Sequence, residues 1–133
     1  MFEAVRDGAS DDAIEGVEVV TRAALAATAT DVLDADAYLL GTPANIGYMS
    51  GALKHFFDTV YYPVVDETAQ RPYAAFVHGN SDTVGAVRAI ETIATGLSWT
   101  KAHDPVEVVG DPSNDDLAAC YELGGTVAAR LVL

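Results

Sequence analysis

The stretch from Asp36 to Asp58 constrains the fold of this chain more than any other part of the sequence. It opens with a near-continuous apolar run, Asp36–Thr42, which is typical of a strand that is covered on both faces. A turn rich in Pro, Gly and Asn follows. Apolar residues at helical spacing come next: Met49, Leu53, Phe56, Phe57 and Val60. In open α/β sheets, ligands bind at such a junction, at the carboxyl end of a strand.

The rest of the chain alternates between short apolar runs and amphipathic stretches. We expect strands at residues 17–20, 36–42, 73–77 and 106–109, and helices near residues 1–9, 28–35, 49–63, 83–97 and 113–131. Pro43 is expected to stop one strand and Pro63 to end one helix, while Thr28 or Thr30 caps the short helix. The pair Gly124-Gly125 either weakens the last helix or marks close backbone packing. Such alternation favours a single α/β domain over residues 1–133, with a parallel sheet between helices.

Composition narrows the classes of partner. Seven Lys and Arg residues face twenty Asp and Glu residues, which leaves a net charge of −13. This charge opposes both a phosphate backbone and an anionic membrane surface, so neither nucleic acid nor membrane is an expected partner. The sequence shows no signal peptide and no apolar run near the length of a membrane span, and we therefore expect a cytoplasmic protein.

Several residue types that often carry chemistry are best interpreted here as structural. The single cysteine, Cys120, excludes an intramolecular disulfide and is expected to be a buried small hydrophobe. Trp99 is expected in the core or at an interface, and Tyr61-Tyr62 either in an exposed subunit contact or in the core. No metal site is predicted, because His55, His78 and His103 lack ligand spacing. No hydrolase triad is predicted, because Ser50 and Ser81 have no elbow motif.

Residues 41–58, GTPANIGYMSGALKHFFD, resemble the flavin-gripping loop of the flavodoxin-like oxidoreductases. This superfamily includes the flavodoxins, the multimeric quinone reductases and the NAD(P)H-dependent FMN reductases. The likeness covers Gly-Thr-Pro, a polar residue, an apolar residue, Gly, a Met-Ser-Gly helix start and Lys-x-Phe-x-Asp. It implies a flavodoxin-like three-layer sandwich with a parallel sheet, FMN as cofactor and NAD(P)H as co-substrate.

The turn after the first long strand has the residue types that a flavin ring requires. Gly47 permits a positive φ and a close backbone approach to a planar ring. Asn45 has both a donor and an acceptor for the polar edge of the ring, and Tyr48 can stack beside it. The flavin contacts expected in this loop are Thr42, Pro43, Ala44, Asn45, Ile46, Gly47, Tyr48 and Met49.

A second loop follows the strand at residues 73–77. Because the carboxyl ends of parallel strands meet at one edge of a sheet, it is expected to lie beside the first loop. The resemblance implies that it contacts the flavin ring and ribityl chain. The alternative is that its polar residues only cap the next helix. The expected contacts are His78, Gly79, Asn80 and Ser81.

The family usually opens with a strand and a Ser/Thr/Gly-rich loop that cradles the flavin phosphate, and the present sequence begins inside the helix that follows them. With strand order 2-1-3-4-5, the first, central strand is then missing, and no phosphate donor is expected. Two explanations remain open. The reading frame begins upstream, so that residues 1–133 are an N-terminally truncated domain. Alternatively, the domain folds without that strand, through pairing of residues 17–20 with residues 36–42 or through oligomerisation.

The function that the resemblance implies first is hydride transfer from NAD(P)H through FMN to a quinone-like or other small acceptor. No catalytic side chain is then required, because the flavin performs the chemistry. Such a protein is expected to form a homo-oligomer. The first alternative is a flavodoxin-like electron carrier whose acidic surface docks basic partners. The second is a non-catalytic interaction module that has lost FMN binding.

Overall fold

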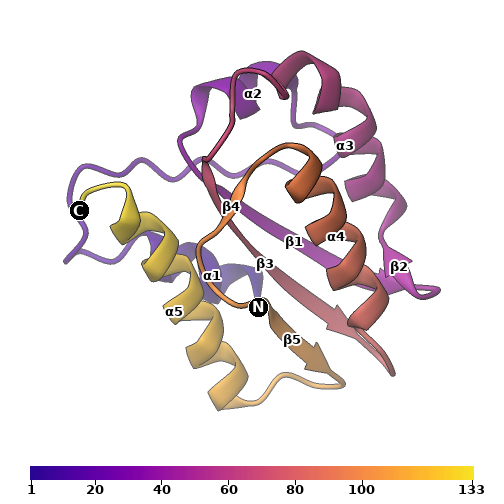
Figure 1. The fold of residues 1–133 in the computed structure, drawn as a ribbon. Helices are drawn as coiled ribbons and strands as arrows, with labels where there is room; N and C mark the ends of the chain where they lie inside the picture. Colours follow the sequence, from indigo (N-terminus) through magenta and orange to yellow (C-terminus); the bar gives the residue numbers. More distant parts are fainter.

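A computed structural model describes all of residues 1–133 as an α/β domain around a five-stranded sheet (Figure 1). The elements, in chain order, are α1 (Phe2–Ala9), α2 (Ala29–Asp34), β1 (Tyr38–Asn45), β2 (Tyr48–Met49), α3 (Gly51–Val64), β3 (Pro72–Gly79), α4 (Val84–Gly96), β4 (Thr100–Lys101), β5 (Val106–Val109) and α5 (Asn114–Arg130).

Four of the five strands run parallel, and three of them, β1, β3 and β5, end at the same edge of the sheet. β3 is central, with β1 on one side and with β4 and then β5 on the other. Only β2 is antiparallel, as the second strand of a hairpin with β1. The loops that leave the carboxyl ends of β1, β3 and β5 therefore share one edge (Figure 1).

Helices cover both faces of the sheet, as the sequence predicted. The larger core lies between the sheet and helices α2, α3 and α4, and it includes Phe57, Val60 and Ile90. The smaller core lies under α1 and α5 and includes Val5 and Leu123. Figure 1 shows the two helical layers on opposite sides of the strands. The three-layer architecture is thus confirmed.

Side-chain caps define the starts of α2, α3 and α5. Thr28, and not Thr30, caps α2 through a capping box with Asp31, and Ser113 caps α5 in the same way. Ser50 caps α3 by accepting a hydrogen bond from the backbone N–H of Leu53 at 3.1 Å. Because these bonds form within three residues of sequence, the start signals could be recognised without tertiary information.

Both expectations for proline were wrong. β1 continues through Pro43 to Asn45, because β1 is an edge strand along most of its length and an edge tolerates the missing N–H. Pro63 lies inside α3, which ends at Val64. So close to the helix end, the proline removes one backbone hydrogen bond without breaking the helix.

The expected strand at residues 17–20 was also wrong. These residues form no ladder, and Val20 is 57% exposed. A strand needs a neighbour for its backbone groups, and the side of β1 that faces away from β3 pairs only with β2, at Ala44 and Asn45. Residues 17–20 therefore do not pair directly with β1, and the β1 edge from Tyr38 to Pro43 is open.

The aromatic side chains stabilise the larger core. Trp99 is buried, stacks on Tyr38 at a centroid distance of 4.1 Å, and donates its indole N–H to Thr68 Oγ1 at 2.9 Å. Its predicted core position is confirmed. The two adjacent tyrosines lie in different environments: Tyr61 packs against the core, whereas the side chain of Tyr62 is 83% exposed.

Cys120 lies on the inner face of α5 and is fully buried, as predicted from the sequence. Burial raises the pKa of its thiol, because the charged thiolate is poorly solvated there. The buried position and the raised pKa both agree with a packing role for this side chain.

Replacing Arg71 with methionine is expected to lower the free energy of unfolding by about 1–3 kcal/mol. Nη1 of Arg71 lies 3.2 Å, 2.9 Å and 2.8 Å from the carbonyl oxygens of Val32, Leu33 and Ala35 at the end of α2, where carbonyl groups lack partners within the helix. Urea denaturation measures the change. The control is Arg88→Met, on an exposed side chain; equal losses in the two variants would contradict the capping role.

Candidate functional site

Three loops meet at the carboxyl edge of the sheet. Pro43 of β1 lies opposite His78 of β3, and Gly79 lies opposite Val109 of β5. The backbone N–H of Gly110 donates to the carbonyl of Gly79 at 2.9 Å. The two loops named from the sequence therefore do lie side by side, and the loop after β5 joins them.

The loop after β1 is a tight β-hairpin that the sequence did not predict. Asn45 pairs with Tyr48, and the two residues between them have φ values of 50° at Ile46 and 73° at Gly47. Two positive φ values are typical of a type I′ turn. The conformation suits Gly47 but is strained for a β-branched residue such as Ile46. Its side chain is fully exposed.

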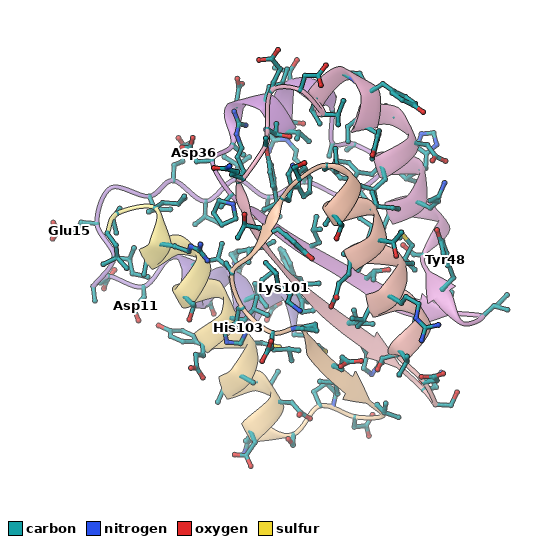
Figure 2. The ribbon with its side chains drawn as sticks, viewed as in Figure 1. Asp11, Glu15, Asp36, Tyr48, Lys101 and His103 are labelled. Carbon is teal, nitrogen blue, oxygen red and sulfur yellow. The ribbon has the colours of Figure 1, made fainter.

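Several side chains of the hairpin are open to a ligand. Asn45 is exposed at the tip, and Tyr48 is 41% exposed. Figure 2 shows Tyr48 at the rim of the molecule, beside the start of α3. Pro43 is exposed and Ala44 is half-buried. The hairpin therefore presents a polar amide and an aromatic ring on one short rigid turn.

Two residues named from the sequence use their side chains inside the protein instead. Thr42 Oγ1 donates to the carbonyl of Pro43 at 2.8 Å and accepts from the backbone N–H of Ser50 at 2.9 Å. Met49 belongs to β2 rather than to the next helix, and it is 2% exposed within the larger core. Only backbone atoms of these two residues remain for contact with a ligand.

The loop after β3 combines a capping part and an open part. Asp82 Oδ1 accepts from the backbone N–H of Val84 at 2.9 Å, at the start of α4. The buried hydroxyl of Thr83 donates to Glu107 Oε1 at 2.9 Å. Asn80 and Ser81 are exposed. The end of this loop therefore caps α4, whereas Asn80 and Ser81 at its beginning remain accessible to a ligand.

His78 and Gly110 connect the loops after β3 and β5. Nε2 of His78 lies 2.6 Å from the carbonyl oxygen of Gly110, so it carries the proton and donates. Gly110 has a φ of 81°, which favours glycine. The sequence analysis missed Gly110, although a glycine directly after a predicted strand signals a turn at the ligand-binding edge.

The sequence analysis also missed Gly85, a residue of α4 that positions the β1–β2 hairpin. A Cβ atom at Gly85 would lie 1.9 Å from the carbonyl oxygen of Gly47, far inside any allowed contact. The hairpin turn therefore rests directly on the first turn of α4. No local pattern could have shown this contact, because the two residues belong to different elements.

A cavity of about 440 Å³ lies next to the ends of β1 and β3. Its wall includes Arg6 and Arg22, and no acidic residue lines it. Both guanidinium groups are about half exposed, and they already lie 3.6 Å from Asp7 and 3.7 Å from Asp31. Together they can attract an anion, but they form no nest of backbone N–H groups of the kind that grips a phosphate.

The outer rim of the same edge is acidic. Exposed carboxylates follow β3 at Asp82 and β5 at Asp111, and Asp115 and Asp116 stand in the first turn of α5. Within a chain of net charge −13, this rim repels anionic small molecules and attracts cationic ones.

No group of three or more His, Cys, Asp and Glu side chains is arranged to hold a metal ion. None of the helices combines the length and the apolar character needed to cross a membrane.

The chain matches the family model described as NADPH-dependent FMN reductase over residues 8–111. It is 31% identical over 145 residues to a flavodoxin of Aquifex aeolicus (strain VF5), a match that covers 96% of this chain and 77% of that protein.

Solved structures show the same fold. A flavodoxin from the domain Archaea superposes with a TM-score of 0.79 at 22% identity, covering 98% of this chain and 87% of that one. The flavodoxin, WrbA-like protein from Agrobacterium tumefaciens gives a TM-score of 0.76 at 20% identity, covering 97% and 87%. The flavodoxin-like fold expected from residues 41–58 is thereby confirmed.

Proposed function

The chain belongs to the NADPH-dependent FMN reductase family, and from that premise we propose that it binds FMN and carries electrons in the manner of a flavodoxin. The observation that supports the proposal most directly is the meeting of three loops at the carboxyl edge of the sheet. This is the position at which α/β sheets of this type hold their ligands.

The residues at this edge fit the ring end of FMN. Asn45 can donate and accept at the polar edge of the ring, and Tyr48 can cover one of its faces. Asn80 and Ser81 are exposed on the neighbouring loop and can bind the ring or the ribityl hydroxyls. Bound FMN supplies reversible electron transfer, and the protein supplies the slot and the surrounding electrostatics.

The acidic rim favours a carrier over a reductase as the main function. NADPH is strongly anionic, and the exposed Asp82, Asp111 and Asp115 belong to the acidic rim of this same edge, so their charges oppose its approach. A basic redox partner is attracted by the same charges, which raise its rate of association. The match to a flavodoxin over 96% of this chain supports this choice.

A second candidate function is NAD(P)H-dependent reduction of a quinone-like or other small acceptor through FMN. The match of residues 8–111 to the reductase family model favours it. The two functions share the flavin and differ in the source of electrons.

Titration of the apoprotein with FMN tests flavin binding, which both functions require. NADPH oxidation then distinguishes the reductase from the carrier. We expect saturable changes in the visible absorbance of FMN, together with reduction by dithionite. We expect no steady consumption of NADPH or NADH in the presence of a quinone. Sustained NADPH oxidation would select the reductase, and absence of FMN binding would reject both functions.

FMN is expected to bind only about three- to ten-fold more tightly than riboflavin at low salt, and the difference is expected to vanish near 1 M salt. The reason is that Arg6 and Arg22 offer exposed charge rather than a backbone nest, and exposed charges are screened. Fluorescence titrations with both flavins measure the ratio. A preference for FMN of more than a hundredfold that persists in salt would reveal a dedicated phosphate site.

A further inference from the structure

The loop after β3, residues 80–83, is a tight turn between the β1–β2 hairpin and the end of β5 (Figure 1). A Cβ atom at Gly79 would lie 2.9 Å from the carbonyl oxygen of Asp82 and 3.2 Å from Cβ of Ala44, so the turn folds back on its own strand and touches β1. The backbone N–H of Gly110, directly after β5, donates to the carbonyl of Gly79 at 2.9 Å. Neighbouring elements therefore hold the turn from both sides.

Asn80 and Ser81 are the exposed polar residues of this turn, and side-chain bonds fix the chain before and after them. Before them, Nε2 of His78 donates to the carbonyl of Gly110 at 2.6 Å. After them, Thr83 makes a second bond to the same side of the sheet, at β5. The two exposed side chains are thus presented by a backbone that is tied down at both ends.

The hydroxyl of Thr83 is used in an unexpected direction. Thr83 occupies the N-cap position of α4, where a threonine side chain usually accepts from a backbone N–H of the first helical turn. It makes no such bond. Its hydroxyl instead donates to Oε1 of Glu107 at 2.9 Å, and Thr83 as a whole is only 5% exposed. Thr83 therefore ties the turn to a different strand rather than stabilising its own helix.

Glu107, the acceptor of this bond, is the single charged residue of β5, and it takes part in none of the four ion pairs of the domain. A hydrogen bond from a hydroxyl to an ionised carboxylate is stronger than a bond between two neutral groups. The two partners are 24 residues apart in sequence. The bond therefore links two elements that the chain itself does not hold together locally.

We propose that Thr83 and Glu107 are positioning residues for the flavin, a role that rests on the proposed function. Their bond holds the end of the turn against β5, and it thereby keeps Asn80 and Ser81 in the geometry in which they bind the ring edge or the ribityl hydroxyls. Thr83 and Glu107 themselves do not touch the flavin. A binding group that is fixed before the ligand arrives costs less ordering on binding, so the bond raises the affinity for flavin.

Fluorescence titrations with FMN and riboflavin test the proposal in variants of the two partners. Thr83→Val removes the hydroxyl, keeps the shape, and should weaken binding of both flavins at least about fivefold. Thr83→Ser keeps the hydroxyl and should bind within about twofold of the unaltered protein. Glu107→Leu should match Thr83→Val, whereas Glu107→Gln retains an acceptor oxygen and should lose less. The variant with both Thr83→Val and Glu107→Leu should lose no more than either single variant, because both remove the same bond.

The matched control is Thr68→Val. Thr68 is also buried, and its hydroxyl donates to the carbonyl of Val64 at 3.0 Å and accepts from the indole N–H of Trp99 at 2.9 Å. It precedes β3, at the opposite end of that strand from the turn. Thr68→Val should lower the free energy of unfolding and leave flavin affinity unchanged. Equal losses of affinity in Thr68→Val and Thr83→Val would overturn the proposal, because general destabilisation would then explain both.

Backbone order parameters of Asn80 and Ser81 in the apoprotein give a readout that needs no flavin. They should fall in Thr83→Val and in Glu107→Leu, although residue 107 is distant in sequence, and they should be retained in Thr83→Ser. Unchanged order parameters in Glu107→Leu would overturn the positioning role. If the unaltered protein binds neither flavin, the proposed function fails and the positioning role fails with it. If it binds both flavins and Thr83→Val binds them equally well, only the positioning role fails.

Discussion

Replacing Gly124 with alanine is expected to lower the free energy of unfolding by about 1–3 kcal/mol, although alanine is the better helix former. A Cβ atom at Gly124 would lie 2.0 Å from the carbonyl oxygen of Val5, which is a backbone atom of α1 and cannot turn aside. On the facing helix, a Cβ atom at Gly8 would lie 1.9 Å from the carbonyl of Tyr121. The two helices therefore touch backbone to backbone, and the new methyl group must push them apart.

The neighbouring glycine provides the control. A Cβ atom at Gly125 would come no closer than 3.3 Å to another atom, the carbonyl oxygen of Gly8. Gly125→Ala should therefore change stability by no more than about 1 kcal/mol, because a shift of a few tenths of an ångström relieves this contact and alanine has the better helix propensity. Urea denaturation of both variants measures the difference. Equal effects at the two positions would show that α1 does not pack on α5 in this way.

Replacing Gly85 with alanine is expected to weaken FMN binding at least about tenfold, which corresponds to about 1.4 kcal/mol. The added methyl group would lie 1.9 Å from the carbonyl oxygen of Gly47, so the hairpin must move away from α4. Asn45 and Tyr48 move with it, and a displacement of about 1 Å is enough to spoil contacts to a rigid ring. Riboflavin binding should fall by the same factor, because the change affects the ring end.

Gly51→Ala is the matched control, since a Cβ atom there meets nothing within 4 Å. It should leave flavin binding unchanged. Amide chemical shifts of Ile46 and Tyr48 give a second readout that needs no flavin, and they should change in Gly85→Ala alone. If those shifts stay in place and FMN still binds normally, the contact between the hairpin and α4 has no positioning role.

The candidate site was predictable in part, because its residues follow a strand in sequence. The pattern from residue 41 to residue 58 indicated a flexible Gly47 beside Asn45 and Tyr48, and the structure places all three on one turn. The same pattern did not show that Tyr48 and Met49 form a strand. A hairpin depends on pairing between two short segments, and a two-residue strand has too few residues to show alternation.

The sequence by itself determined the approximate positions of the five helices and of the strands β1, β3 and β5, and the alternation that produces a parallel sheet. These features depend on interactions within about one helical turn or on the periodicity of a single element. Only the tertiary structure decided that residues 17–20 remain without a partner, that the β1 edge is open, and that Gly85 and Gly124 must lack side chains. Each of these depends on which backbone approaches from a distant part of the chain, and no local pattern encodes such an approach.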